Sequence, residues 1–205
     1  MSFDQEIAGV NVSRETIERL ELYAGLLEKW NKSINLIAPS TISDLWARHI
    51  VDSAQVFALG RREGSWIDIG TGGGFPGLVC AIIAQEQAPD LNFSFIEADR
   101  RKCEFLRTVL RETQTKANVL PQRIEDAELP PAAVISARAL APLDRLLALS
   151  APFRDPDTVC LFQKGANYKA ELDAALVNWS FSLQKTTSQT DPNAVILSLG
   201  AIARV

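Results

Sequence analysis

Apolar residues along this chain follow two alternating spacings, and the alternation predicts an α/β fold. Short apolar runs of strand length recur from Trp66 onward, separated by stretches in which apolar residues return every three or four positions. This alternation is typical of a mostly parallel sheet with helices on both faces. Two last apolar runs predict an antiparallel end to that sheet. The expected strands are 67–69, 93–96, 119–120, 132–136, 159–162, 179–184 and 195–199, and the expected helices are 78–85, 102–112, 143–149 and 169–176.

Two helical segments are expected before this alternation begins. Ser13 precedes a run with one apolar face, and its hydroxyl suits the N-cap of a helix that ends near 31–33. A second helix is expected after Ser40 or Thr41. We therefore expect residues 1–60 to form an N-terminal helical cap on a core of residues 61–205, as one structural domain overall.

The composition excludes several classes of protein. Hydrophobic residues make up 47% and charged residues 22% of the chain, which is ordinary for a globular domain. No apolar run approaches the roughly 20 residues that cross a bilayer, and the acidic residues 1–6 lack the features of a signal peptide. We therefore expect a cytoplasmic protein with no membrane partner, and nothing in the sequence demands more than a monomer.

Cysteine, histidine and charge limit the chemistry further. His49 is the only histidine, and the three cysteines at 80, 103 and 160 are far apart, so we expect buried thiols and no metal. The net charge of −4 argues against general nucleic-acid binding. A local basic patch is still available within one short segment, from Arg100, Arg101, Lys102, Arg107 and Arg111.

The segment 67–77 carries the strongest chemical signal. Its sequence, IDIGTGGGFPG, is an apolar run with an acidic residue, followed by a glycine-rich loop and the start of a helix. Glycine lets the backbone turn tightly and pass close to a ligand, because no Cβ keeps the ligand away. A loop of this kind between strand and helix predicts a cradle for a nucleotide cofactor.

The neighbours of the loop favour one cofactor over another. Residues 72–77 formally satisfy G-x-G-x-x-G, so a nicotinamide dinucleotide has to be considered. Asp68 would repel a pyrophosphate, but it suits the ammonium of S-adenosylmethionine, directly or through water. Phe75 and Pro76 stand where a phosphate would need bare N–H groups. Glu97, at the end of the next strand, can accept the ribose hydroxyls of either cofactor. We expect S-adenosylmethionine; a dinucleotide and a turn without ligand stay open.

Later positions extend this site and bear on what is methylated. Ile124 and Glu125 follow the third strand, where a methyltransferase usually holds the adenine, and Arg138 ends the fourth strand on the ligand side. The segment 136–139 does not match the (Asn/Asp/Ser)-Pro-Pro-aromatic loop of many adenine amine methyltransferases. No cysteine is placed as an exposed nucleophile for cytosine C5. A free lone pair such as guanine N7 needs no general base and is compatible with the sequence.

Five motifs together resemble a known family. In chain order they are KWNKSINL at 29–36, RHIVDS at 48–53, DIGTGGGFPG at 68–77, RALAPL at 138–143 and KG at 164–165. The chain resembles, over nearly its whole length, the RsmG family of bacterial 16S ribosomal RNA guanine-N7 methyltransferases, also called glucose-inhibited division protein B. The resemblance implies a Rossmann-like class I methyltransferase fold, with 16S ribosomal RNA in the small ribosomal subunit as partner. A dinucleotide oxidoreductase and a non-catalytic ribosome-assembly factor are the alternatives.

The resemblance also implies roles for individual residues. Cofactor contacts are implied for Gly70, Phe75, Ile124, Glu125 and Arg138, to which the chemistry above adds Asp68, Gly72 and Glu97. Asn35 and His49 would border the mouth of the active site beside Arg138, although Asn35 could merely cap the first helix and His49 could merely pack. RNA contacts are implied for Arg101 and Lys102, together with Arg100, and for Lys164. The chain departs from the family at 189–203, which lacks basic residues.

Overall fold

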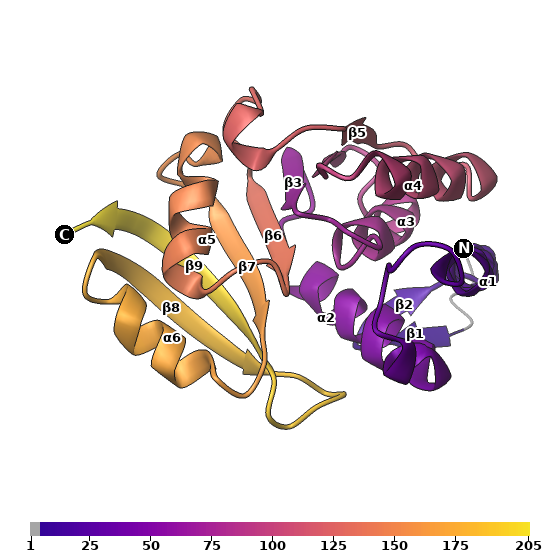
Figure 1. Cartoon of the computed structure of the whole chain (residues 1–205), viewed down its shortest axis with the longest axis horizontal. Coiled ribbons are helices and arrows are strands. Elements are labelled where there is room, and N and C mark those ends of the chain that lie inside the picture. Colours follow the sequence, from indigo (N-terminus) through magenta and orange to yellow (C-terminus); the bar gives the residue numbers. More distant parts are fainter. Residues whose placement is uncertain (1–4) are drawn as a thin grey trace.

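A seven-stranded sheet forms the centre of the protein, and its strand order creates a crevice for a ligand. The computed structural model describes residues 5–205 (Figure 1). The strand order is β5-β4-β3-β6-β7-β9-β8, with the first five strands parallel and β9 antiparallel to both of its neighbours. The chain therefore reverses its direction of winding between β3 and β6, which places a ligand crevice outside the carboxyl ends of these two strands. The strands are β3 Ser65–Ile69, β4 Asn92–Ile96, β5 Asn118–Leu120, β6 Val134–Arg138, β7 Val159–Lys164, β8 Trp179–Thr187 and β9 Val195–Arg204.

All strands and helices expected from 67 onward are confirmed. The largest differences in their bounds are at the last two strands, since β8 extends to Thr187 rather than 184 and β9 to Arg204 rather than 199. Strand β6 is shifted by two residues towards the C-terminus, from 132–136 to Val134–Arg138. Arg138 is the last residue of β6, which confirms its expected place at the end of the fourth strand. The helices of this part are α3 Gly77–Gln87, α4 Arg100–Glu112, α5 Leu143–Ser150 and α6 Tyr168–Ala175.

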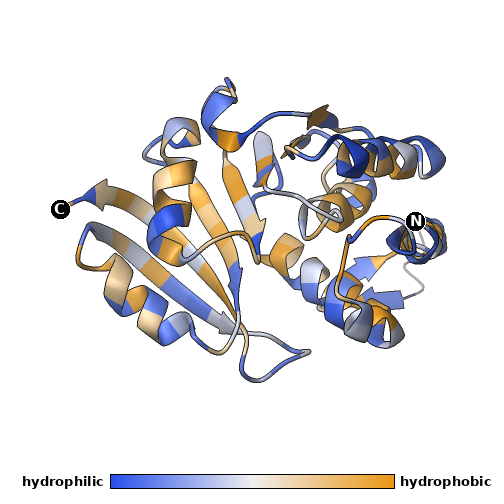
Figure 2. Cartoon of the chain, in the orientation of Figure 1, coloured by the Kyte–Doolittle hydropathy of each residue, from blue (hydrophilic) through white to orange (hydrophobic). Residues whose placement is uncertain are grey.

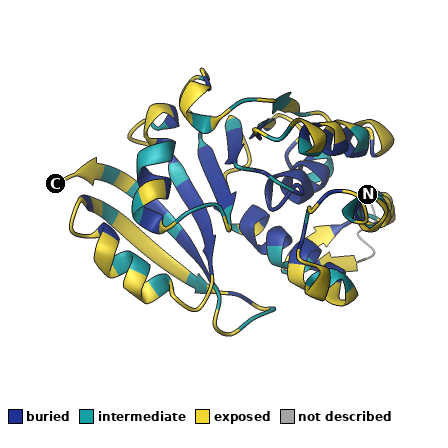
Figure 3. Cartoon of the chain, viewed as in Figure 1, coloured by how far each residue is buried: buried dark blue, intermediate teal, exposed yellow. Residues whose placement is uncertain are grey.

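Two hydrophobic clusters lie on the two faces of the sheet. Alternate residues of β3 go to different clusters, since Trp66 belongs to the cluster of α1–α4 and Ile67 to that of α5 and α6. Figure 2 shows apolar residues along the central strands, and Figure 3 shows that the same strands are buried, whereas the edge strand β8 is largely exposed. Both faces of the parallel part of the sheet are therefore covered, as such sheets require.

The N-terminal part agrees only partly with the expected pair of helices. Helix α1, Arg14–Asn31, begins as expected, with the Ser13 hydroxyl accepting from Thr16 N–H at 3.3 Å. The second segment is wrong as one continuous helix: a 3₁₀ stretch Pro39–Asp44 and a π-helical stretch Trp46–Val51 precede α2, Asp52–Leu59.

A short hairpin precedes α1 and was not expected. Strands β1, Gln5–Ile7, and β2, Val10–Val12, pair in an antiparallel manner. Residues 1–4 of the predicted cap, with most of the acidic segment 1–6, lie outside the described residues. The hairpin, α1 and α2 share one hydrophobic cluster with α3 and α4, so the cap and the core pack as a unit; the division at residue 60 stays a prediction.

All three cysteines are buried thiols, as the sequence predicts. Burial raises the pKa of Cys160 to about 12, so this thiol does not ionise to a nucleophile near neutral pH. Within residues 5–205 no helix has the length and apolar character needed to cross a membrane. The same residues contain no group of three or more His, Cys, Asp or Glu side chains arranged to hold a metal ion.

Candidate cofactor and substrate site

The glycine-rich loop between β3 and α3 is tied to the end of β4. The backbone N–H groups of Gly70 and Thr71 both donate to the Ile96 carbonyl, at 2.9 and 3.2 Å. Gly70 has φ of +64° and a Cβ there would lie 2.6 Å from Leu140 Cδ1. Gly72 has φ of +58°, but an added Cβ would meet nothing closer than 3.8 Å. Glycine is thus required at 70 by both conformation and space, and at 72 by conformation alone.

Asp68 is held inside the fold rather than at the surface of a cavity. Its carboxylate is fully buried and accepts hydrogen bonds from Ser136 Oγ at 2.5 Å and from Gly77 N–H at 3.3 Å. Burial raises the pKa of Asp68 to about 6, and the bond from Ser136 counteracts part of that rise. Trp66 in turn donates its indole N–H to Ser136 at 2.8 Å. Asp68 therefore fixes the start of α3 to the sheet, and a direct contact with a cofactor ammonium stays a prediction.

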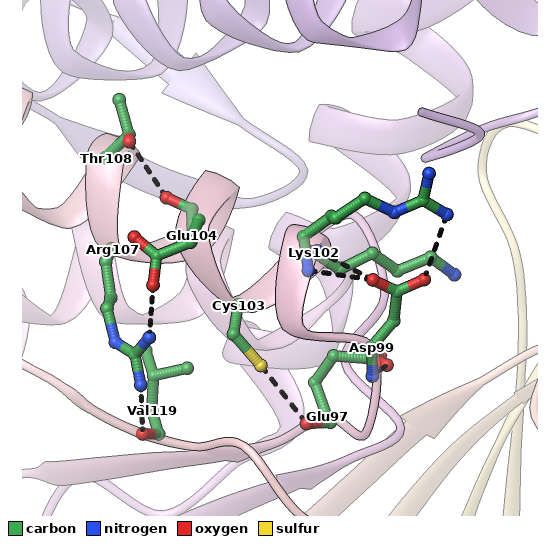
Figure 4. A network of polar contacts seen from close by, with 9 residues as sticks. Glu97, Asp99, Lys102, Cys103, Glu104, Arg107, Thr108 and Val119 are labelled. Atoms are coloured by element: carbon green, nitrogen blue, oxygen red, sulfur yellow. Dashed lines mark hydrogen bonds and ion pairs between the residues drawn. The ribbon is translucent and has the colours of Figure 1, made fainter. Parts of the chain in front are cut away.

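Glu97 brings a carboxylate to the same loop from the end of β4. Its Oε2 accepts from Gly72 N–H at 2.8 Å, and its Oε1 accepts from Asp99 N–H at 2.8 Å. Figure 4 shows Glu97 beside Asp99, where α4 begins. Asp99 caps α4 by accepting from the N–H groups of Arg101 and Lys102, at 2.8 and 3.3 Å. The carboxylate of Glu97 is thereby placed by two backbone contacts.

Most of the predicted cofactor residues line one cavity of about 550 Å³, which we call the loop cavity. This cavity lies at the carboxyl ends of β3, β4 and β6, where the winding of the sheet reverses. Its wall combines backbone of the loop, the carboxylates of Glu97 and Glu125, and apolar side chains from several segments. The predicted residues in its wall are Gly70, Gly72, Phe75, Glu97, Ile124, Glu125 and Arg138. Of the predicted cofactor residues, only the buried Asp68 is not part of it.

Phe75 lies between His49 and Arg138, two of the residues that were expected at the mouth of the active site. The guanidinium carbon of Arg138 is 4.5 Å from the centroid of the Phe75 ring, and the His49 ring centroid is 5.0 Å from it. Tyr23 packs against the same ring at 5.4 Å and donates its hydroxyl to the Gly73 carbonyl at 2.5 Å. Phe75 is therefore held by α1, by the π-helical stretch and by the end of β6, which are far apart in the sequence.

His49 is uncharged near neutral pH. Burial, together with the nearby cations Arg138 and Arg48, lowers the pKa of His49 to about 3. Its Nε2 lies 2.9 Å from Thr41 Oγ1, and its Nδ1 has no partner within the described part of the chain. The ring can therefore accept or donate a hydrogen bond as a neutral imidazole, but it is a poor proton donor at physiological pH.

A second cavity of about 710 Å³ adjoins the loop cavity, and we call it the neighbouring cavity. The two cavities share five wall residues, including Arg138 and Leu140. His49, Asp52 and Gln163 belong to the neighbouring cavity alone. A group bound in one cavity would therefore meet a group bound in the other across the end of β6.

Two predicted residues occupy places that do not match their expected roles. Asn35 is exposed and lines neither cavity, whereas its neighbour Leu36 lines both. Lys164 is only 9% exposed, and its ammonium pairs with Glu171 at 2.7 Å and donates to the Ala141 carbonyl at 2.6 Å. A phosphate would have to displace these contacts, so an RNA contact from Lys164 stays a prediction that requires the pair to open.

The predicted RNA-binding residues of α4 are more accessible. Arg100 and Arg101 are exposed at the start of the helix, and Lys102 lines the loop cavity. Arg101 lies 3.6 Å from Asp99, a contact between largely exposed groups that contributes little to stability. Along the same helix, Arg107 pairs with Glu104 at 2.6 Å. Accessible positive charge is thus available in the first turn of α4, where Lys102 lines the loop cavity.

Several residues of the site were not anticipated from sequence. Asp52 accepts from Gln163 Nε2 at 2.5 Å, from Ser188 Oγ at 2.8 Å and from Thr190 Oγ1 at 3.1 Å. These contacts connect α2 with β7 and with the turn before β9, both of which are over 100 positions from Asp52 in the sequence. No short-range pattern signals such a network; the RHIVDS motif at 48–53 was the one available indication of Asp52.

Comparisons with known proteins agree with this arrangement. A family model described as "GidB: rRNA small subunit methyltransferase G" matches residues 16–194. A "Ribosomal RNA small subunit methyltransferase G" of Cereibacter sphaeroides is 51% identical over 96% of this chain and 95% of its own length. The protein of the same name from Sinorhizobium medicae is 43% identical over 99% of this chain and 97% of its own length.

Solved structures confirm the fold class. M. jannaschii TYW2 in complex with AdoMet has a TM-score of 0.59 at 11% identity, covering 85% of this chain and 80% of that one. A TehB-like SAM-dependent methyltransferase from Corynebacterium glutamicum has a TM-score of 0.57 at 14% identity, covering 90% of this chain and 99% of that one. At these identities the likeness concerns the fold alone, and the fold is the Rossmann-like class I methyltransferase fold.

Proposed function

Since the chain belongs to the rRNA small subunit methyltransferase G (GidB) family, we propose that it transfers a methyl group from S-adenosylmethionine to N7 of one guanine in 16S ribosomal RNA. The observation that carries this proposal is the pair of adjoining cavities, which share Arg138 at the reversal point of the sheet. One cavity has the wall of a nucleoside cofactor site, and the other can receive a base from RNA. We further infer that the enzyme is cytoplasmic and works as a monomer.

The loop cavity fits S-adenosylmethionine by the chemistry of its wall. Glu97 offers carboxylate oxygens where ribose hydroxyls need acceptors, and Ile124 offers an apolar surface to an adenine ring. The backbone of 70–73 lies along the same wall without side chains at the three glycines. When bound, the cofactor supplies a sulfonium methyl that a nucleophile displaces in line.

The residues of the neighbouring cavity suit a guanine whose N7 lone pair is the nucleophile. Attack by N7 needs no general base, because no proton leaves this atom. A proton donor close to N7 would instead occupy the lone pair and block the reaction. His49 stays neutral because its pKa is held at about 3, and in the tautomer whose Nε2–H donates to Thr41 its Nδ1 is an acceptor that leaves the N7 lone pair free. A stacked base cannot reach the cofactor, so we expect the target guanine to be flipped out or looped.

The charge distribution suits one-sided contact with RNA. The chain is acidic overall, but Arg100, Arg101 and Lys102 lie together in the first turn of α4, where Lys102 lines the loop cavity. Contacts of these cations with phosphates would make binding weaken as salt rises. The acidic remainder of the surface would limit binding elsewhere on the RNA.

The test is transfer of labelled methyl from S-adenosylmethionine to small ribosomal subunits that lack N7-methylguanosine in 16S RNA. We expect one methyl per subunit, mapped to a single guanine by chemical cleavage at N7-methylguanosine. Gly72→Asp should abolish incorporation, because it puts a carboxylate into the wall of the loop cavity. Subunits that gain no methyl, or binding of reduced nicotinamide cofactor without competition from S-adenosylhomocysteine, would contradict the proposal. Size-exclusion chromatography with light scattering checks the monomer.

A further inference from the structure

Gln163 has one amide orientation that its contacts determine. It lies near the end of β7, is 7% exposed and lines the neighbouring cavity. Its Nε2 lies 2.5 Å from Asp52 Oδ2 and 3.2 Å from the Asp52 carbonyl oxygen. Both of these atoms are acceptors, so the amide nitrogen must face Asp52 and the amide oxygen must point elsewhere. The side chain cannot be flipped without placing oxygen against oxygen.

The amide oxygen of Gln163 has no hydrogen-bond partner among residues 5–205. The Asp52 carboxylate next to it is well supplied with donors, since Ser188, Thr190 and Gln55 also donate to it. A buried acceptor without a partner lowers stability, so such an atom calls for a reason. His49 Nδ1, in the wall of the same cavity, is the second buried atom of this kind. Both residues line the neighbouring cavity, but these two atoms are covered, so a ligand in the cavity reaches them only after a side chain moves.

Gln163 lies next to Arg138 on the adjacent strand of the sheet. The two residues are paired in register across β6 and β7, at the carboxyl ends of both strands. Paired residues of adjacent strands point to the same side of a sheet, and the strands are about 4.8 Å apart, a spacing comparable with the width of a purine. Arg138 lies in the wall that separates the two cavities. A guanine in the neighbouring cavity with N7 facing this wall would therefore turn its N1 and 2-amino edge towards Gln163.

We propose that Gln163 is a specificity-determining residue that accepts a hydrogen bond from the N1–H and 2-amino edge of the target guanine. This inference rests on the proposed function. Guanine presents two donors on this edge, whereas adenine presents an acceptor at N1 and no amino group at C2. A fixed acceptor therefore favours guanine and leaves an adenine facing an unpaired oxygen. The oxygen is covered by its neighbours, so we expect small side-chain adjustments on binding, as hydrogen bonds of active sites often tighten only in the complex.

The chain offers a matched control for this proposal. Gln55 is also buried, at 4% exposure, and donates to Asp52 at 3.3 Å; its amide oxygen accepts from Gln189 N–H at 2.9 Å, and it does not line either cavity. Gln163→Met and Gln55→Met remove the same amide from the same network. Only the first change removes an acceptor from the neighbouring cavity, so any effect on base recognition separates the two variants.

The experiment compares methyl transfer to unmethylated small subunits carrying guanine or adenine at the mapped target. For Gln163→Met we expect kcat/KM on the guanine substrate to fall about tenfold, and the preference for guanine over adenine to shrink by a similar factor. For Gln55→Met both quantities should stay within about twofold of the unmodified enzyme. Affinity for S-adenosylhomocysteine should be unchanged in both variants, which also verifies that they fold.

Two results would overturn the assignment of Gln163. One is an unchanged preference for guanine in Gln163→Met; the other is an equal loss of kcat/KM in the two variants, which would indicate a role in packing alone. Failure of the unmodified enzyme to methylate any subunit would instead count against the proposed function.

Discussion

Glu97 accepts a hydrogen bond from the backbone N–H of Gly72, with 2.8 Å between Oε2 and the nitrogen. The carboxylate that is predicted to bind the ribose is therefore also a clamp on the glycine-rich loop. Its other oxygen accepts from Asp99 N–H at 2.8 Å, which ties the clamp to the start of α4. A change at Glu97 should thus affect the cofactor through lost contacts and through a loosened loop.

We predict that Glu97→Gln weakens binding of S-adenosylhomocysteine about tenfold. The amide keeps one acceptor but loses the negative charge that strengthens hydrogen bonds from ribose hydroxyls and from Gly72 N–H. Isothermal titration calorimetry measures the change in Kd. Glu104→Gln is the matched control, because Glu104 is exposed on α4 and, within residues 5–205, forms an ion pair with Arg107 alone. Equal affinities for Glu97→Gln and the unmodified chain would exclude Glu97 from the cofactor site.

The two glycines at 70 and 72 should respond differently to alanine. Both have positive φ, so each substitution costs about 1–2 kcal/mol of folding stability for the backbone conformation. At Gly70 the new Cβ would also lie 2.6 Å from Leu140 Cδ1, which adds about 1–3 kcal/mol of overpacking. Urea denaturation should therefore show a larger loss of stability for Gly70→Ala than for Gly72→Ala. A loss of the same size in both variants would contradict the contact with Leu140.

The fold could be predicted from sequence further than the site could. Strands such as β4 and helices such as α4 can be predicted from the spacing of their apolar residues, because those residues form the face that the element buries. The hairpin β1–β2 was missed because three-residue strands contain too few alternations to be recognised. The second helix was wrong because its 3₁₀ and π-helical stretches depart from a 3.6-residue period.

Within the site, local chemistry identified some residues, and long-range packing decided the others. Glu97 and Arg138 were found because a polar residue at the carboxyl end of a parallel strand faces the crevice. Asp68 met the same rule but is fully buried, because Ser136 from the adjacent strand β6 donates to it. Gln163 had no sequence signal, because its importance comes from Asp52, over 100 positions away. A contact between residues so far apart in the sequence can be recognised only in the folded structure.

Acidification should change stability through His49 and Asp68 in opposite directions. The pKa of His49 is about 3 in the folded chain and about 6.5 in the unfolded chain, so the unfolded chain binds the proton first and stability falls as pH drops below 6.5. The pKa of Asp68 is about 6 in the folded chain and 3.8 in the unfolded chain, so this group adds stability as pH drops from 6 towards 3.8.

Unfolding measured at pH 7 and pH 5 separates the two groups. His49→Gln should lose less stability between these pH values than the unmodified chain, because the unfolded state no longer gains that proton. Asp68→Asn should lose more, because the folded state no longer gains its proton. Each difference can reach about 1.4 kcal/mol per pH unit. If the free energy of unfolding changed with pH equally in both variants and in the unmodified chain, burial would not shift the pKa values of His49 and Asp68.

The basic end of α4 should determine affinity for RNA without affecting the cofactor. Arg100 is exposed and has no ion-pair partner within residues 5–205, so its charge is available to a phosphate. We predict that Arg100→Ala raises KM for small subunits about three- to tenfold and reduces the salt dependence of binding by about one phosphate contact. Affinity for S-adenosylhomocysteine should not change. Arg14→Ala provides the comparison, because Arg14 is exposed on α1, where it pairs with Glu18 at 2.9 Å. An equal rise of KM in both variants would show that overall charge, rather than the position of the cation in the first turn of α4, controls binding.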